Sequence, residues 1–325
     1  MNRRENMLAI LNHQPHDHIG NYKTDMCLCG GSFETFENGP KGGGYDGFGC
    51  KWLPSDSALG QGVPVGKPIL EDVCAWEDVV KFPNLDEFDW EGLAKMQLAN
   101  FDPENQIIEY GMWNGQFLRF SHLMGFENGL CAMYEEPEAC LALLNAITDY
   151  KIRLAERAVE YFKPDTICCY DDVATERALF MSPAAYREFI KPMHKRFNDA
   201  VKEMGVIPNQ HICGKCEDII PDIIEEGAAA WEICQPENDI VGLQAKYGNK
   251  LAFIGCYDMK GELAYRDVTE EELRASARET IDKYGPGGNF ALMGMILYGD
   301  AAKFVKTMDI LSDETVKYGT NYYCK

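Results

Sequence analysis

The sequence has little positive charge. Its 325 residues include 31 lysines and arginines against 52 aspartates and glutamates, which gives a formal net charge of −21. A surface with this excess of negative charge repels the phosphates of nucleic acids and of anionic membranes. We therefore expect no nucleic-acid partner, and we interpret the charge mainly as a means of keeping the protein soluble.

Long apolar runs are lacking as well. No stretch reaches the roughly 18 residues of a membrane-spanning helix, and residues 1–5 lead into an amphipathic helix instead of an apolar signal region. The 13 cysteines are odd in number and scattered, a pattern typical of reduced thiols and not of a disulfide framework. These features predict a cytoplasmic protein without membrane contact, and so many thiols suit an anaerobic host.

Nucleotide binding and serine-hydrolase activity are not supported by any motif, because the sequence contains neither a Walker loop nor a G-x-S-x-G elbow. What the sequence does contain is a repeated alternation of apolar strands and amphipathic helices, which predicts a parallel sheet covered on both faces. The predicted strands are 19–29, 107–113, 165–170, 206–213, 229–234, 251–256 and 290–293. The predicted helices are 2–12, 117–134, 137–162, 182–203, 217–226, 239–247, 269–284 and 300–318. We expect an α/β fold, a (β/α)8 TIM barrel formed by a single domain over residues 1–325, with its chemistry at the carboxyl ends of the strands.

The region 30–66 is rich in glycine, proline and aromatic residues and shows little periodicity. So long a loop in a compact domain is usually functional. We therefore predict a lid or a binding loop here.

The segment 209–218 holds the most informative group of side chains, with His211, Cys213 and Cys216 at the end of a strand and in the loop behind it. Residues i and i+2 of a strand point the same way, so His211 and Cys213 face one point. One imidazole and two thiols are ligand types that zinc prefers. The alternative is that these cysteines are small buried apolar residues and that the histidine bonds to the backbone.

Several further side chains are predicted to meet at the same rim of the barrel. Asp171 and Asp172 directly follow an apolar strand, where carboxylates serve as acid, base, ligand or orienting group, or simply as caps. The complete predicted rim comprises Trp113, Tyr170, Asp171, Asp172, His211, Cys213, Cys216, Gln235, Cys256, Tyr257, Asp258 and Met293.

The chain resembles the uroporphyrinogen decarboxylase superfamily over nearly its whole length. The residues that carry this resemblance are Arg3-Arg4-Glu5-Asn6, Asp46-Gly-Phe-Gly, Tyr170-Asp171-Asp172, Ser182-Pro183-x-x-Tyr186, Pro192, His211-x-Cys213-Gly214, Glu225-Glu226-Gly227 and Gly255-Cys256-Tyr257-Asp258. The resemblance implies a (β/α)8 barrel.

Within that superfamily the chain departs from the true decarboxylases. Their arginine-rich segment is replaced here by Met26-Cys-Leu-Cys-Gly-Gly, and Met293-Gly294-Met295 stands where they carry Gly-His-Gly. The chain looks more like the zinc methyltransferases that work with a corrinoid protein. Those that methylate coenzyme M use His-x-Cys, matched by His211 and Cys213, together with a later cysteine that the last strand lacks.

The branch that demethylates phenyl methyl ethers is associated with Asp, Cys and Cys, separated by 27 and 39 residues. Glu188, Cys216 and Cys256 have this spacing, with Glu in place of Asp. The resemblance therefore implies a Zn²⁺ site of Glu188, Cys216 and Cys256, with His211 and Cys213 as the alternative set. It also implies a small methylated substrate and a cobalamin-type corrinoid that a partner protein carries. A homodimer is compatible with the resemblance.

The implied activity is transfer of a methyl group from a methoxylated, aromatic substrate to the corrinoid protein. Asp171, Asp172 and His211 are the expected catalytic residues. The expected substrate contacts are Trp113, Tyr170, Gln235, Tyr257, Asp258 and Met293. Two alternatives stay open: a methyl-corrinoid:thiol methyltransferase of the coenzyme M type, and a barrel of other activity.

Overall fold

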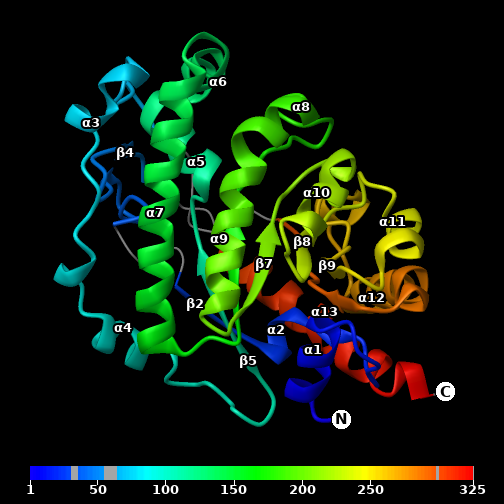
Figure 1. Ribbon diagram of the computed structural model, residues 1–325. Helices are drawn as coiled ribbons and strands as arrows, with labels where there is room; N and C mark the ends of the chain where they lie inside the picture. The colour runs from blue at the N-terminus through cyan, green and yellow to red at the C-terminus, as the bar shows by residue number, and fades with distance from the viewer. Residues whose placement is uncertain (31–35, 55–63, 298–299, 325) are drawn as a thin grey trace.

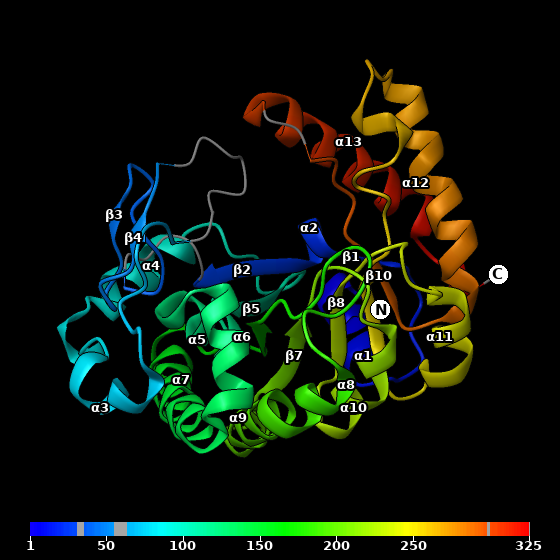
Figure 2. The same ribbon diagram turned by 90° about the horizontal axis from the view of Figure 1, so that it is seen from above.

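The computed structural model describes residues 1–30, 36–54, 64–297 and 300–324. Its main sheet has eight parallel strands in the order β1-β10-β9-β8-β7-β6-β5-β2. They are β1 (Gly20–Asn21), β2 (Met26–Gly30), β5 (Ile107–Met112), β6 (Thr166–Tyr170), β7 (Ile207–His211), β8 (Ala230–Cys234), β9 (Ala252–Gly255) and β10 (Phe290–Leu292). The strands curve into a nearly closed barrel with helices around it (Figure 2), which confirms the predicted (β/α)8 architecture.

Helices precede, connect and follow the strands (Figure 1). They are α1 (Arg3–Leu11), α2 (Tyr22–Asp25), α3 (Trp76–Val79), α4 (Trp90–Gln97), α5 (Gln116–Met124), α6 (Phe126–Glu135), α7 (Pro137–Phe162), α8 (Pro183–Ala185), α9 (Lys191–Glu203), α10 (Ile220–Glu225), α11 (Ile240–Tyr247), α12 (Glu270–Tyr284) and α13 (Ala301–Gly319). In the described part of the chain, no helix combines the length and apolarity needed to cross a membrane. Strands β6 and β8 are buried at every residue, as expected of a parallel sheet covered on both faces.

The predicted first strand, 19–29, is in fact two barrel strands separated by the one-turn helix α2. The side chain of Asn21 accepts a hydrogen bond from the Lys23 backbone, and Asp25 accepts one from the Asn21 backbone, so the chain turns where a continuous strand was expected. β1 then pairs with β10 and β2 pairs with β5. One short segment thus supplies both edges of the sheet.

Two predicted helices are also interrupted. The helix expected over 117–134 breaks at Gly125, whose φ of 77° and ψ of 147° suit glycine. A side chain there would also meet Pro68 at 2.8 Å. The helix expected over 182–203 contains the π-helical turn η4 (Tyr186–Ile190) ahead of Pro192, which has no N–H for a regular helical bond.

The predicted lid region lies partly outside the described residues, namely at 31–35 and 55–63. Its described part contains a short antiparallel pair, β3 (Gly44–Tyr45) and β4 (Lys51–Trp52). Asp46 fixes this pair, because it accepts hydrogen bonds from the Cys50 backbone at 2.8 Å and from the Trp52 indole at 3.1 Å. Arg119 of α5 is fully buried and pairs with Asp46 at 2.9 Å. This part of the region is therefore anchored to the barrel wall.

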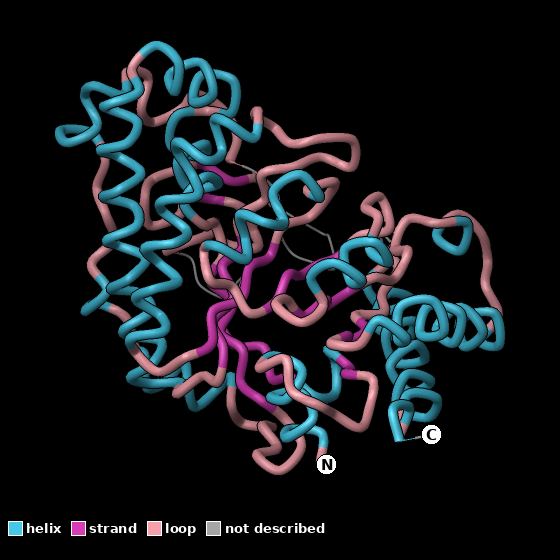
Figure 3. Tube along the Cα trace, turned by 45° about the vertical axis from the view of Figure 1, so that its right-hand side comes forward, coloured by secondary structure: helices cyan, strands magenta, loops and turns pink. Residues whose placement is uncertain are grey.

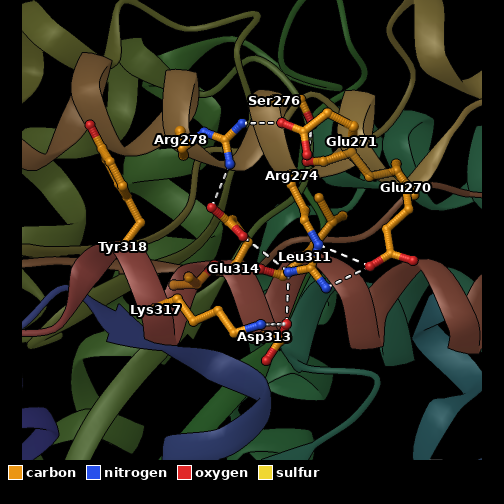
Figure 4. A network of polar contacts seen from close by, with 12 residues as sticks. Glu270, Glu271, Arg274, Ser276, Arg278, Leu311, Asp313, Glu314, Lys317 and Tyr318 are labelled. Carbon is orange, nitrogen blue, oxygen red and sulfur yellow. Dashed lines mark hydrogen bonds and ion pairs between the residues drawn. The ribbon is translucent and has the colours of Figure 1, made fainter.

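Ion pairs join the last two long helices, which lie side by side. Glu314 of α13 accepts hydrogen bonds from Arg274 at 3.0 Å and from Arg278 at 2.6 Å, both on α12 (Figure 4). Near the two chain ends, which lie on the same side of the barrel (Figure 3), Tyr323 donates its backbone N–H to Asp17.

Candidate metal centre and substrate cavity

A cluster of ligand-type side chains lies at the carboxyl end of β7. His211 is the last residue of this strand, and its Nε2 lies 3.4 Å from the Cys213 thiol. The Asp172 carboxylate, which follows β6, accepts a hydrogen bond from the Cys213 backbone at 2.6 Å. One ligand atom from each of the three residues lies within 4.8 Å of the others, and all three side chains are partly accessible. We call this set the rim group.

The donor set of the rim group fits a zinc-like cation. Imidazole, thiolate and carboxylate are ordinary zinc ligands, and three protein ligands leave a position for substrate. His211 is oriented from behind, since its Nδ1 lies 2.9 Å from Glu232 of β8. A carboxylate behind a histidine is the usual support of a metal-binding imidazole. The structure thus joins the alternative ligand pair, His211 and Cys213, to Asp172.

The electrostatics of the rim group favour a protonated His211 and a neutral Cys213 thiol. Burial alone lowers the pKa of His211, but the adjacent Cys213 and Glu232 raise it well above its usual value. Burial raises the pKa of the Cys213 thiol, while His211 opposes that shift. A bound cation would take the place of the histidine's proton and deprotonate the thiol.

The first-choice ligand set is not assembled among the described residues. Glu188 lies on the π-helical turn η4 with an exposed side chain, whereas Cys216 and Cys256 are both buried. The two cysteines border Cys234, whose pKa is raised first by burial and then by the Cys256 and Cys216 thiols. No cluster containing this glutamate and these cysteines occurs in the part of the chain that the structure describes.

Asp171, predicted as catalytic, lies in a closed environment. Its carboxylate accepts backbone hydrogen bonds from Phe117 and Leu118 at the start of α5, at 2.9 and 2.8 Å, and contacts His194 at 2.7 Å. It is fully buried. The adjacent Asp172 belongs instead to the rim group, so the two carboxylates have different surroundings.

The predicted aromatic contacts stack on one another. Trp113 and Tyr170 lie 4.8 Å apart with an interplanar angle of 11°, and Tyr170 stacks on His211 at 4.2 Å and 18°. The Tyr170 hydroxyl also lies 3.3 Å from the hydroxyl of Tyr22. Tyr170 therefore holds the imidazole in place and is sandwiched between its two neighbours.

The other predicted substrate contacts lie elsewhere. Gln235 is buried and accepts a hydrogen bond from the Gly214 backbone at 2.6 Å, and Met293 is buried. Tyr257 lies 2.7 Å from Ser276 of α12, hydroxyl to hydroxyl. Tyr257 and Asp258 line a second cavity of about 280 Å³ beside α12, and Asp172 does not line that cavity.

A cavity of about 480 Å³ reaches the rim group at Asp172. It lies between the start of α6, one side of α5 and the segments around residues 50 and 66. Its walls are mainly apolar and include Val65, Ile69, Leu118, Phe126 and Phe180, with His122 among them. Burial, reinforced by Arg119 and Lys151, lowers the pKa of His122 well below its usual value, which keeps this imidazole neutral.

These cavity residues were missed by the sequence analysis. They come from separate segments of the chain, and each alone has the pattern of an ordinary core or loop residue. The only available signal was the composition of the region 30–66, which did predict a binding loop.

Together, the fold and the site define a parallel (β/α)8 barrel with its candidate centre at the carboxyl ends of the strands, as is usual for enzymes of this architecture. The family model described as "Uroporphyrinogen decarboxylase (URO-D)" matches residues 104–295. The chain belongs to the uroporphyrinogen decarboxylase family, which confirms the family identified from the sequence motifs.

Among solved structures, a methyltransferase from Methanosarcina mazei superposes with a TM-score of 0.70 at 15% identity, covering 98% of this chain and 99% of that chain. At this identity the likeness concerns the fold. A structure of IOLI protein with a bound zinc atom gives a TM-score of 0.41 at 9% identity over 74% of this chain and 85% of that one, too low to indicate a shared fold. No curated protein matches the sequence.

Proposed function

We propose that this protein is a zinc-dependent methyltransferase that moves a methyl group from a methoxylated aromatic compound to a corrinoid carried by a partner protein. The observation that carries this proposal is the rim group of Asp172, His211 and Cys213 at the end of an apolar cavity. Ligand sites of this kind are concave and mostly apolar, with a few convergent polar groups. The methyltransferase from Methanosarcina mazei, with the same fold, supports the choice of reaction class.

Asp172, His211 and Cys213 would hold the cation, which when bound supplies Lewis acidity at the ether oxygen. In the overall reaction the bond between the methyl carbon and oxygen breaks, and the oxygen keeps the bonding pair and takes a proton from water. The methyl carbon forms its new bond with both electrons of a Co(I) centre.

The residues of this chain bind and orient. Leu118, Phe126 and Phe180 would pack on the aromatic ring and exclude water from the reacting bond. Glu232 holds the Nδ1 side of His211, so Nε2 faces the thiol of Cys213. The stacked Tyr170 limits tilting of the imidazole.

The ligand types favour this reaction over transfer to a thiol. One thiolate and one carboxylate only balance the two positive charges of zinc, so a neutral ether oxygen is still polarised strongly. Sites rich in thiolate add negative charge and instead make a bound thiolate more nucleophilic. One observation favours the thiol reaction as the second candidate: the His-x-Cys pair belongs to the assembled group.

Metal analysis of variants purified without a metal-binding tag tests the ligand assignment. Compared with wild type, Cys213→Ala and His211→Ala should each contain about one zinc fewer per chain. Cys216→Ala and Cys256→Ala are matched buried-cysteine controls and should keep the wild-type content. Loss of zinc in these two controls but not in Cys213→Ala would refute the rim group as the zinc site and would favour Glu188, Cys216 and Cys256 as the ligands.

The activity itself is measured as methylation of Co(I) cobalamin by a methoxylated benzoate, followed from the cobalamin spectrum. Cys213→Ala should lower the rate by about 100-fold or more, as expected on losing a metal ligand. Methylcobalamin with a thiol acceptor is the comparison. Turnover only in the second assay would favour the thiol reaction, and turnover in neither would refute methyl transfer.

A further inference from the structure

A second group of potential ligands lies inside the barrel, next to the rim group. Glu109 of β5, Cys168 of β6 and Glu232 of β8 are completely buried. One ligand atom from each lies within 4.8 Å of the other two. None of the comparisons and none of the sequence motifs assigns a role to these three residues. We call them the interior group.

Of the two carboxylates in the interior group, Glu232 pairs with His211, and Glu109 has no basic partner among the described residues. Glu109 accepts a hydrogen bond from the Tyr22 hydroxyl at 3.1 Å and a long one from the Asn209 amide at 3.5 Å. Glu232 contacts His211 through one oxygen. Over the described ranges of the chain, no lysine or arginine forms an ion pair with either carboxylate. Burying two such charges costs several kcal/mol unless another charge compensates them.

Two oxygen acceptors of this region have no hydrogen-bond partner in the part of the chain that the structure describes. The second oxygen of Glu232 and the side-chain oxygen of Asn209 are both buried and unpartnered. Asn209 is fully buried on β7, and its amide borders Glu109. Buried acceptors without a partner indicate a missing donor or ion. A single proton shared by the carboxylates would satisfy at most one of these oxygens.

We propose that the interior group is a second cation site, occupied by a divalent transition metal such as Zn²⁺, Mn²⁺ or Fe²⁺. A divalent ion would balance both carboxylates and use the unpartnered oxygen of Glu232, with the Asn209 oxygen as a further ligand. The Cys168 thiolate favours a borderline metal over Mg²⁺ or Ca²⁺. The ion would tie β5, β6 and β8 together across the barrel interior. This proposal does not depend on the proposed methyl transfer.

The geometry predicts how the two sites differ in access. The rim group opens onto the large cavity, whereas the ligands of the interior group have no exposed surface. A chelator should therefore remove metal from the rim group within minutes and leave the interior ion in place until the protein unfolds. The interior ion would be acquired during folding.

The test uses the full chain with Cys213→Ala, which removes the rim group. This variant is unfolded, refolded under reducing conditions with Co²⁺, treated with a chelator and analysed for metal and for a thiolate-to-cobalt absorption band. We expect about one cobalt per chain and the band, because Cys168 supplies the remaining thiolate. Adding Glu109→Gln should remove the metal.

The double variant Cys213→Ala/Cys168→Ser is nearly isosteric with Cys213→Ala and tests the thiol even where Glu109→Gln does not fold. It should lose the absorption band. Cys213→Ala/Cys140→Ser is the matched control, since Cys140 is buried in α7 outside both groups, and it should keep the band. Absence of chelator-resistant metal in Cys213→Ala, with Co²⁺ and equally with Zn²⁺, Mn²⁺ or Fe²⁺, would overturn the proposal. A band that survives Cys168→Ser would overturn it as well.

Discussion

His194 is a buried histidine whose charge state is set by two carboxylates. It contacts Asp171 at 2.7 Å, and its other ring nitrogen lies 3.5 Å from Glu226. Burial lowers the pKa of His194, but the two carboxylates outweigh this effect, and the net result is a pKa of about 9 in place of the ordinary 6.5. The protonated histidine thus completes a buried arrangement that also caps α5 through Asp171.

This raised pKa predicts how stability depends on pH. Because the folded-state value lies above the unfolded one, the contribution of His194 is complete below about pH 6.5 and is lost as the pH rises through about 9. The full contribution is about 3 kcal/mol. Urea unfolding between pH 6 and 10 should show this loss in wild type and much less of it in His194→Gln.

His16→Gln is the control for that experiment, because burial lowers the pKa of His16, which is the opposite of the shift at His194. The control should retain the wild-type loss of stability. Equal slopes in wild type and His194→Gln would show that the histidine is not charged in the folded protein.

At this scale the sequence predicted which neighbouring side chains lie together better than which distant ones do. His211 and Cys213 were placed together by strand periodicity alone. Asp171 and Asp172 were indistinguishable, because neighbouring residues after a strand point in different directions and only the packing of α5 decides which one is enclosed. The Glu188 spacing matched a known pattern, but spacing does not reveal that the helix turns this side chain outward.

At the scale of elements, α12 and α13 are joined by a network of charged side chains (Figure 4). Glu314 is its centre, because it is mostly buried and accepts hydrogen bonds from both Arg274 and Arg278. Isolated surface pairs contribute little, but a shared and partly buried partner contributes more.

Glu314→Gln should therefore lower the melting temperature by about 2–4 °C, because two arginines lose their common anion. Calorimetry measures the effect. Glu271→Gln is the matched control, since the exposed Glu271 pairs with Arg278 alone among the described residues, and it should change the melting temperature by less. A larger effect from the control would mean that Glu314 is not the centre of the network.

The predicted boundaries of helices and strands were wrong where local hydrogen bonding competes with the apolar pattern. The pattern over 19–29 is that of one strand, yet the Asn21 cap and Asp25 insert a turn of helix. The break at Gly125 was likewise hidden inside a continuous amphipathic pattern. Strands β6 to β10 were predicted near their true positions, because buried parallel strands are short, apolar and bounded by helices.

For the whole molecule, the weakest part of the barrel is the seam between β1 and β2. Each of these strands has one neighbour in the sheet, whereas β6 and β7 have two. Leu28 in the middle of β2 is 40% exposed, and β6 is completely buried.

Amides at this seam should therefore exchange with deuterium at least about tenfold faster than those of β6 and β7, because local opening there disrupts fewer contacts. Hydrogen exchange with mass spectrometry measures this directly. Equal protection in both regions would mean that the barrel opens only as a unit. The rate at 166–170 should equal that of global unfolding and serves as the internal reference.

The pairing of β1 with β10 also has a consequence for biosynthesis. Gly20 pairs with Ala291, so a ribosome must add about 270 residues after the first strand before its partner exists, roughly 15–50 s at bacterial and eukaryotic elongation speeds. During that time a nascent chain can pair β5 to β9 but cannot join β1 to the sheet. Chaperones that bind nascent chains would meet an open sheet that lacks β10, and a polypeptide truncated before β10 would remain in that state.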